Sequence, residues 1–547
     1  MDGNETVKRT GFLWFATSVA AVLAAFVWNA QSQIKSGASQ FLASDRCTAC
    51  HNKLTTRSGE DFSHVPSWRP TMMANSARDP YWQASVRREV LEHPEAQAAI
   101  EDECSICHMP MARFESKKAG HSGAVFSHLG FAPDNQEDAL AADGVSCLLC
   151  HQIDKDKLGT RESFSGQFII SGPNAQGERL AYGPYAPDAG QIKVMLMSTG
   201  GFRPVESAHL GESELCAVCH TLITKALGAD GREIGELPEQ VPYLEWLHSD
   251  YHGKRSCQSC HMPKISEDTA ISSILGVPRS GMSRHSFPGG NFFMTEIFNR
   301  NRDELKVQSS PEELAGAVGK IKSYLQSQAA RVSIGAVEVR GGRLEAYVTL
   351  SNLGGHKLPT AYPSRRVWVH LTVKDGKNQT VFESGAMNAS GAIVGNDNDA
   401  DATRFEPHYT EIRDPGQVQI YESIMADSAG AVTTGVLKAV RYIKDNRLLP
   451  QGFDKKTAEK DIAIAGNASE DPDFIGGSDR VRYSIVLGKA QGPFRIDAEL
   501  CFQPIGYRWA INLKSYKAEE PRKFTRQFEE AAASSNWRVN FRGSSAL

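Results

Sequence analysis

The first half of the chain contains five copies of the pentapeptide Cys-x-x-Cys-His. They are Cys47/Cys50/His51, Cys104/Cys107/His108, Cys147/Cys150/His151, Cys216/Cys219/His220 and Cys257/Cys260/His261. Two thiols and an imidazole at this spacing are typical of covalent c-type haem attachment, in which the cysteines form thioethers with the porphyrin and the histidine coordinates the iron. The sequence therefore predicts five covalently bound c-type haems, with the five motif histidines as proximal ligands.

Two other chemistries use Cys-x-x-Cys. Paired motifs build zinc sites, and single ones act as redox dithiols. Zinc does not require a histidine directly after the second cysteine in all five copies, and a thioredoxin-like dithiol would occur once, in a βαβ pattern. Ten of the 11 cysteines belong to the motifs; Cys501 is left over and is expected to be buried.

The second axial position of each iron decides what the chain can do. A protein side chain at that position makes the haem a redox relay, whereas an open position lets it bind a small molecule. Of the 16 histidines, 11 lie outside the motifs, enough to close all five sites. The distal candidates are His209, His285, His356, His128 and His64, with Met72 and Met73 as possible thioether ligands. Either His248 or His252 is a weaker candidate, and His93, His121, His370 and His408 are expected to be surface or structural.

The N-terminus combines Lys8 and Arg9 with an uncharged apolar run from Gly11 to Trp28. Eighteen apolar residues can just span a bilayer as a helix. A cleaved signal peptide is the alternative, but a site after Ala30 would place Trp28 where a small residue is preferred. We expect a retained signal anchor, with the basic residues in the cytoplasm and the rest outside it.

Compartment and partners follow from these features. Haem attachment to c-type cytochromes takes place outside the cytoplasm, so we expect a bacterial inner-membrane location with the bulk of the chain in the periplasm. The net charge is −4 and no basic stripe is present, so nothing indicates nucleic acid. The expected partners are a membrane quinol-oxidising complex, a reaction centre or a periplasmic cytochrome, or a larger membrane complex that contains the chain as a subunit.

The expected fold class is α+β multidomain. Residues 1–34 are assigned to the anchor and tether, 35–305 to a loop-rich, mainly α pentahaem domain, 306–330 to a connecting helix, and 331–547 to an antiparallel β-sandwich-like domain. In the pentahaem part, apolar residues at a spacing of four predict a helix around Asp79–Glu92. Ser310-Pro311-Glu312-Glu313 has the pattern of a capping box and predicts a helix from 311 to about 329.

The C-terminal part alternates apolar and polar residues in short runs between Gly, Asn and Asp, which favours strands. The runs are Val332–Val339, Leu344–Leu350, Arg366–Val373, Val481–Leu487 and Ile496–Phe502. A helix is expected near residues 434–446. Asp471, Asp473 and Asp479 are a weak calcium candidate, because acidic loops are more often simply solvated.

Several stretches resemble multihaem c-type cytochromes related to the tetrahaem electron acceptor of hydroxylamine oxidoreductase. The similar strings are Met72–Pro80, Cys107–Met111, Gly144-Val145, Tyr182–Tyr185, Glu245–Leu247, Cys260–Pro263, Gly355–Thr360 and Tyr362–Arg366. Ala361 departs from the glycine that is usual at that position. The resemblance implies a multihaem protein without specifying a substrate, since most members move electrons and a minority are catalytic.

Two functions are therefore weighed. The first is an electron relay between a membrane or periplasmic donor and an acceptor. In that case His356 would place the C-terminal part against the haems through an iron bond. The second is an oxidoreductase for a small nitrogen or sulfur compound at one open haem. No Cys-x-x-Cys-Lys motif, which some nitrite reductases use, is present.

Overall fold

The computed structural model describes residues 39–534 and 539–546. Ala43–Leu547 form one compact unit. The expected membrane-anchor helix falls in the first 38 residues and lies outside the described part. Nowhere in the described ranges is there a helix long and apolar enough to cross a membrane.

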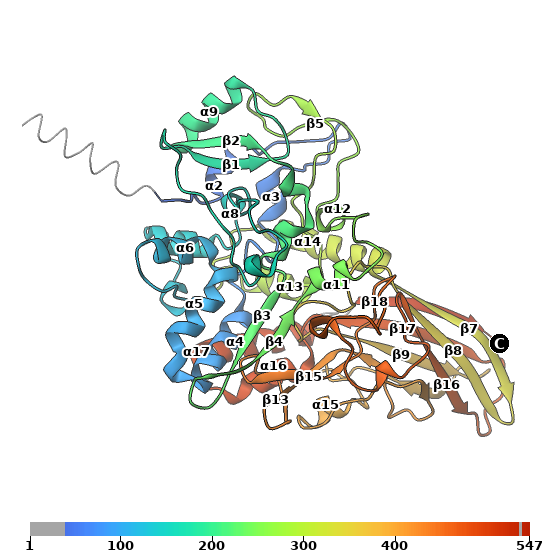
Figure 1. The fold of residues 1–547 in the computed structure, drawn as a ribbon. Helices are drawn as coiled ribbons and strands as arrows, with labels where there is room; N and C mark the ends of the chain where they lie inside the picture. The colour runs from blue at the N-terminus through green and yellow to red at the C-terminus, as the bar shows by residue number, and fades with distance from the viewer. Residues whose placement is uncertain (1–38, 535–538, 547) are drawn as a thin grey trace, which may run out of the picture. The chain divides into compact units, whose positions relative to one another are not determined.

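Helices occur along the whole of the described chain (Figure 1). Those of the first half are α2 (Asp45–Thr48), α3 (His64–Trp68), α4 (Pro80–Glu92), α5 (Gln97–His108), α6 (Pro110–Lys118), α7 (Gln136–Ala142), α8 (Cys147–Cys150), α9 (Ala189–Thr199), α10 (Ser213–Ala217), α11 (Pro242–Leu247), α12 (Cys257–His261) and α13 (Phe292–Arg300). Those that follow are α14 (Pro311–Tyr324), α15 (Asp397–Ala400), α16 (Tyr507–Asn512) and α17 (Glu519–Ser534).

Strands also occur in both halves. The haem-motif half contains β1 (Arg179–Gly183), β2 (Phe202–Glu206), β3 (Leu222–Leu227), β4 (Glu233–Gln240), β5 (Thr269–Ala270) and β6 (Pro278–Arg279). The C-terminal half contains β7 (Ala330–Arg340), β8 (Arg343–Asn352), β9 (Arg366–Lys374), β10 (Thr380–Ser384), β11 (Glu411–Ile412), β12 (Ile420–Tyr421), β13 (Ser423–Asp427), β14 (Val432–Thr433), β15 (Ala439–Asp445), β16 (Ser478–Val486), β17 (Arg495–Gln503) and β18 (Val539–Ala546).

The expected fold class is wrong, because the chain is mixed α/β rather than a mainly α region followed by an antiparallel sandwich. The haem-motif half contains a parallel pair, β1–β2, and an antiparallel hairpin, β3–β4. Gly231 has a φ of +72° in the hairpin turn, a conformation that glycine adopts without strain. In the C-terminal half, β11 pairs with β16 in parallel. β1 and β2 have five residues each and β11 has two, which is too short for an alternating pattern to identify them.

Individual elements of the C-terminal half agree with their sequence patterns. The five expected strands correspond to β7, β8, β9, β16 and β17, in a sheet ordered β10-β9-β17-β18 (with β12 on β9) and a sheet ordered β11-β16-β8-β7. The helix expected near 434–446 is wrong, because that segment contains strand β15, paired with β13. In β15, Ala439, Lys444 and Asp445 are buried and Arg441 is exposed, so its burial does not follow the alternation that identifies a strand.

Local signals start the two best-predicted helices. Asp79 caps α4 by accepting hydrogen bonds from the backbone N–H groups of Tyr81 (2.8 Å) and Trp82 (3.3 Å), and Pro80 occupies the first turn. Ser310 and Glu313 form a reciprocal capping box at α14. One face of α4, which includes Trp82 and Glu89, lines the cavity described in the next subsection.

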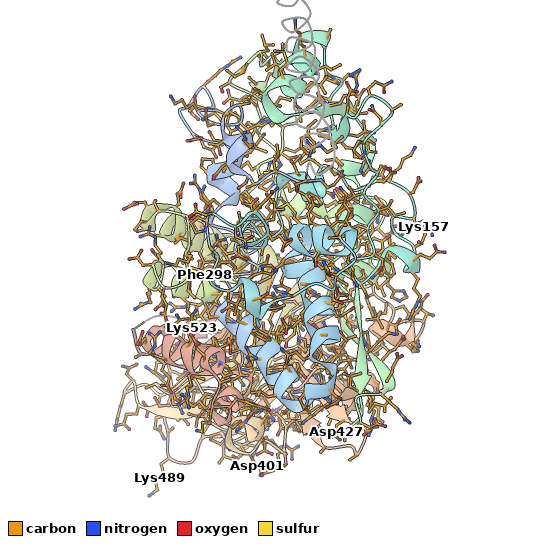
Figure 2. The ribbon with its side chains drawn as sticks, turned by 90° about the vertical axis from the view of Figure 1, so that its left-hand side faces the viewer. Lys157, Phe298, Asp401, Asp427, Lys489 and Lys523 are labelled. Carbon is orange, nitrogen blue, oxygen red and sulfur yellow. The ribbon has the colours of Figure 1, made fainter. Side chains whose placement is uncertain are left out.

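The two halves share one hydrophobic core. Helix α17, close to the C-terminus, packs along α4, where Arg87 makes a paired ion contact with Glu520 at 2.8 Å (Figure 1). Phe298 of α13 is completely buried in this core, whereas the side chains of Lys157 and Lys489 project outward (Figure 2). Because residues from the two halves pack against each other, side chains from both halves can line the same cavity.

Candidate functional site

All five Cys-x-x-Cys-His motifs line one cavity of about 2170 Å³. Pockets for drug-sized ligands usually enclose about 300–1,000 Å³, so this cavity has room for several large groups. Its walls are mostly apolar, and the ten motif cysteines form no disulfide. The volume and the shared lining fit several large, flat, apolar cofactors.

Each motif sits on or beside a short helical turn. The turns are α2, the end of α5, α8, α10 and α12. Because residues three apart lie on the same face of a helix, the two cysteines of a motif point to one side and the histidine follows directly. This is the arrangement that thioether attachment and axial coordination require.

Four of the five motif histidines use Nδ1 to hydrogen-bond a backbone carbonyl. The bonds join His51 to Ile271 (2.7 Å), His108 to Ser76 (2.9 Å), His151 to Tyr182 (2.6 Å) and His261 to Pro288 (2.6 Å). A carbonyl only accepts, so Nδ1 carries the hydrogen and Nε2 keeps its lone pair for a metal. For His220 no such bond is recorded in residues 39–534 and 539–546.

Burial keeps these imidazoles neutral. It lowers the pKa of His108 and of His220 to about 4, and it also lowers the pKa of His51, His151 and His261. Neutral imidazole is the form that coordinates a metal. The donor set therefore fits five haem irons. Within the described residues, no motif gathers the three or more close ligands that a zinc site would need.

Two predicted distal histidines lie at a distance from a motif histidine that would allow both rings to bind one iron. The ring centres of His356 and His261 are 6.3 Å apart with nearly parallel planes (15°), and those of His285 and His151 are 6.4 Å apart at 17°. Two metal–imidazole bonds of about 2.0–2.1 Å would place rings that face each other across an iron with their centres about 6 Å apart. Both distal candidates also direct Nδ1 to a backbone carbonyl.

His64 belongs to the same group of rings as His285. Its ring centre lies 5.3 Å from His51 and 4.4 Å from His285, and its Nδ1 has no hydrogen-bond partner among the described residues. Burial and the neighbouring histidines hold the pKa of His64 well below its usual value. The first and third motifs are thus brought together with two of the predicted distal ligands.

The other predicted distal residues are placed differently. His209 accepts from the Ser207 hydroxyl at Nδ1 (2.6 Å) and donates to the Ile153 carbonyl from Nε2 (2.9 Å), and His128 pairs with Asp138 at 2.7 Å. Neither is among the residues that line the cavity, whereas Met72 and Met73 both line it. Distal ligation by any of these residues stays a prediction.

A buried ion network holds the loop that carries His356. Glu245 of α11 accepts hydrogen bonds from the Lys357 backbone N–H (3.0 Å) and the Thr360 hydroxyl (2.6 Å), and it pairs with Arg447 at 3.0 Å. Asp445 in turn contacts the Lys357 ammonium at 2.7 Å and Arg447 at 2.8 Å. All four ionised side chains are nearly inaccessible to solvent, so this loop is fixed from both halves of the chain.

The second motif lies beside an aromatic ring and two buried carboxylates, none of which the sequence pattern predicts. The His108 ring stacks on Trp82 (4.3 Å between centres, 3° between planes). Glu89 and Glu239 line the cavity nearby, and together with Glu103 they raise the pKa of the Cys104 thiol, after burial itself. Glu89 lies on the same α4 face as Trp82, seven residues further along, and only this helical periodicity in the sequence could have suggested it.

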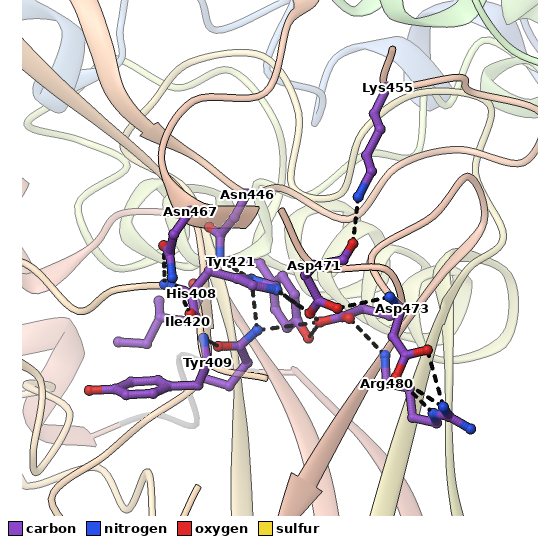
Figure 3. A network of polar contacts seen from close by, with 12 residues as sticks. His408, Tyr409, Ile420, Tyr421, Asn446, Lys455, Asn467, Asp471, Asp473 and Arg480 are labelled. Atoms are coloured by element: carbon purple, nitrogen blue, oxygen red, sulfur yellow. Dashed lines mark hydrogen bonds and ion pairs between the residues drawn. The ribbon is translucent and has the colours of Figure 1, made fainter. Parts of the chain in front are cut away.

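The calcium candidate is a hydrogen-bonded network (Figure 3). His408 Nδ1 accepts from the amide groups of Gln419 (3.0 Å) and Asn446 (3.1 Å), so Nε2 carries the hydrogen and donates to Asp471 (3.0 Å). Backbone partners fix both amide orientations: Gln419 Oε1 accepts from an N–H at 2.8 Å, and Asn446 Oδ1 from another at 3.1 Å. A protonated Nε2 has no lone pair for a metal.

The remaining acidic residues of that candidate are also paired. Asp473 pairs with Arg480 at 3.0 Å, and Asp479 accepts from the buried Tyr421 hydroxyl at 2.5 Å. Calcium takes six to eight oxygen ligands, and hydrogen bonds already occupy these oxygens. The geometry does not support a calcium site here.

Comparisons with known proteins give one finding. No protein-family model and no curated protein matches the chain. Among solved structures, the chain is similar to a penta-heme cytochrome c552 from Thermochromatium tepidum, with 14% sequence identity and a TM-score of 0.48, over 93% of this chain and 99% of that chain. A similarity of this size does not establish a family or an activity for this chain.

Proposed function

We propose that the chain is a multihaem c-type cytochrome that holds five covalently attached haems and passes electrons between redox partners. The observation that carries the proposal is the single cavity lined by all five motifs. Carbonyl-oriented Nδ1 groups in four motifs and the buried, neutral state of all five motif histidines support it. A haem supplies one-electron chemistry through its iron; the protein residues attach it, orient its ligands and exclude water.

The geometry favours bis-histidine coordination at two of the five sites. His356 would supply the distal imidazole to a haem at the fifth motif, and His285 would supply it to a haem at the third. Bis-histidine ligation closes the iron to substrates, which suits an electron relay. The relation to the tetrahaem cytochromes, suggested by the shared strings, is part of this proposal.

Compartment and partners complete the proposal. The proposed location is outside the bacterial cytoplasm, because covalent haem attachment to c-type cytochromes takes place there. Its partners would be redox proteins: a quinol-oxidising membrane complex, a reaction centre or a periplasmic cytochrome. Stopped-flow reduction by each candidate donor tests this: a saturating, fast reduction supports a partner, and reduction no faster than by an unrelated cytochrome rules it out.

One observation favours a second function, oxidation or reduction of a small nitrogen or sulfur compound. Of the histidines in the described residues, none outside the motifs forms a ring contact with His108 or with His220, and the His108 ring stacks on Trp82. If no side chain closed the distal side of a haem iron at the second motif, a substrate could bind there near Glu89 and Glu239.

Haem content and spin state test both functions. A pyridine haemochrome assay and the mass of the intact protein should give five haems per chain; fewer than five contradicts the proposal. Low-temperature EPR of the oxidised protein then separates the two functions. Five low-spin haems support the relay, whereas one full-stoichiometry high-spin signal that disappears in Cys104→Ser/Cys107→Ser supports a substrate-binding iron.

A further inference from the structure

We propose that Glu239 is a redox-linked proton-binding site: its carboxylate takes up a proton from solvent when the haem of the second motif gains an electron. The inference rests on the proposed function, because it requires a haem at Cys104 and Cys107. The ligand of this site is a proton. The protein residues that surround Glu239 carry the argument.

Glu239 and Glu89 are buried acids that face the second motif. Their residues are 8% and 3% exposed, and both line the cavity. Glu239 Oε2 accepts one hydrogen bond, from the Thr224 hydroxyl at 2.6 Å. Both carboxylates act electrostatically on Cys104, the first haem-attachment cysteine of that motif. A charge change at this motif is therefore felt directly by Glu239.

The two buried acids, Glu89 and Glu239, have one cation close to both, Arg88. The titratable and hydrogen-bonding groups that face Glu239 are Arg88 and Glu89 of α4, Glu103 and Cys104 of α5, Thr224 of β3, Tyr362 of the loop before β9, and Tyr442 of β15. Arg88 pairs with Glu89. Glu103 is exposed and interacts with the cations of Arg113, Lys225 and Lys117. The two buried carboxylates, Glu89 and Glu239, therefore have the Arg88 guanidinium between them, and ionising both in a buried site is costly.

Glu239 is the acid on which the proton resides. Glu89 has two stabilising partners, because Arg88 pairs with it and the Val436 backbone N–H donates to it at 3.0 Å, whereas the recorded side-chain partner of Glu239 is the neutral Thr224 hydroxyl. Burial, followed by the charge of Glu89, raises the pKa of Glu239 to about 7. Added negative charge at the adjacent motif raises that proton affinity further.

An exposed carboxylate that can exchange protons with solvent lies beside the cluster. Glu103 is exposed, lines the same cavity and acts electrostatically on both Cys104 and Glu239. In the proposed step, one electron from an external reductant converts ferric to ferrous iron at the second motif, and one proton from water converts the Glu239 carboxylate to the acid. The net charge of the buried site is then unchanged.

Potentiometric titration of the full holoprotein between about pH 6 and pH 9, followed by haem absorbance, tests the proposal. In the wild type, one haem step should shift by up to about 59 mV per pH unit, the value for one proton per electron. Glu239→Gln should remove the pH dependence of that step. Glu236→Gln, on the same strand but paired at the surface with Arg161 at 3.5 Å, should keep it.

Two further measurements prevent ambiguity. Thr224→Val removes the hydrogen bond that stabilises the ionised carboxylate, so it should move the pH-dependent window upward without removing the acid. A reduced-minus-oxidised infrared spectrum should show a carboxylic acid band that is missing in Glu239→Gln. Five haems with an unchanged pH dependence in Glu239→Gln would overturn this inference alone, whereas a haem count below five would overturn the proposed function.

Discussion

Replacing Glu245 with glutamine tests whether the buried network fixes the His356 loop. Glu245 is completely buried and joins α11 to the loop through the Lys357 N–H and the Thr360 hydroxyl. Glutamine has nearly the same shape, so packing is preserved and the change is one of charge. The glutamine Oε1 can still accept hydrogen bonds. Its NH₂ group, however, would face either Arg447 or the Lys357 N–H and the Thr360 hydroxyl, all of which donate.

The size of the effect follows from the charges. Lys357 and Arg447 are balanced by Asp445 and Glu245, and the side chains are at most 8% exposed. Removing one partner leaves two buried cations for one anion, and breaking a buried pair in this way costs about 3–5 kcal/mol. We expect Glu245→Gln to lower the free energy of unfolding by that amount.

Urea unfolding followed by far-UV circular dichroism measures the loss. Glu338→Gln is the matched control, because Glu338 pairs with Arg340 on an exposed strand and exposed pairs contribute about 0–1 kcal/mol. If His356 closes the fifth haem, the Glu245 variant should also perturb one low-spin EPR signal. A loss below about 1 kcal/mol with an unchanged spectrum would refute the view that this network positions the loop.

Three other outcomes are expected. Burial raises the pKa of Glu239 from 4.5 to about 7, so the wild type loses stability as the pH rises between these two values. At 1.36 kcal/mol per pH unit, the free energy of unfolding of Glu239→Gln should exceed that of the wild type by about 3 kcal/mol at pH 8. Urea unfolding should show this difference at pH 8 and none at pH 4. Cys147→Ser/Cys150→Ser should bind one haem fewer in a pyridine haemochrome assay, and an unchanged count would contradict the role of that motif. His408→Ala should lower the free energy of unfolding by about 2–4 kcal/mol, because the buried side chains of Gln419, Asn446 and Asp471 lose their hydrogen bonds to His408. EDTA should leave the melting temperature of the wild type unchanged. A melting temperature lowered by EDTA would indicate a bound metal.

The motifs were predictable from sequence because their chemistry is local. Five residues contain both thiols and the imidazole, so no tertiary information is needed to identify them. The same holds for α14, whose capping box lies within four residues. The strand β15 lies where the local spacing predicts a helix. Its conformation is decided by pairing with β13, and local sequence spacing does not reveal this pairing.

The carboxylate cluster could not be found in this way. Glu89 and Glu239 are 150 positions apart, and they meet because the β3–β4 hairpin is held in place by the C-terminal half. The Leu227 N–H donates to the Leu437 carbonyl at 2.6 Å, and the Tyr442 hydroxyl donates to the Pro238 carbonyl at 3.0 Å. Neither glutamate carries a local signal that distinguishes it from a surface acid.

These contacts bear on the role of the C-terminal half. It supplies part of the cavity wall, including His356, Tyr362 and Arg365. Arg365 lies in the cavity, donates to the Asn291 amide oxygen at 3.0 Å, and acts electrostatically on His220. With the proposed haems in place, a wall residue with these contacts would influence the potential of the nearest haem through its charge. The sheets would then act on the proposed electron path itself, because they fix the charges and the loop that face the cavity.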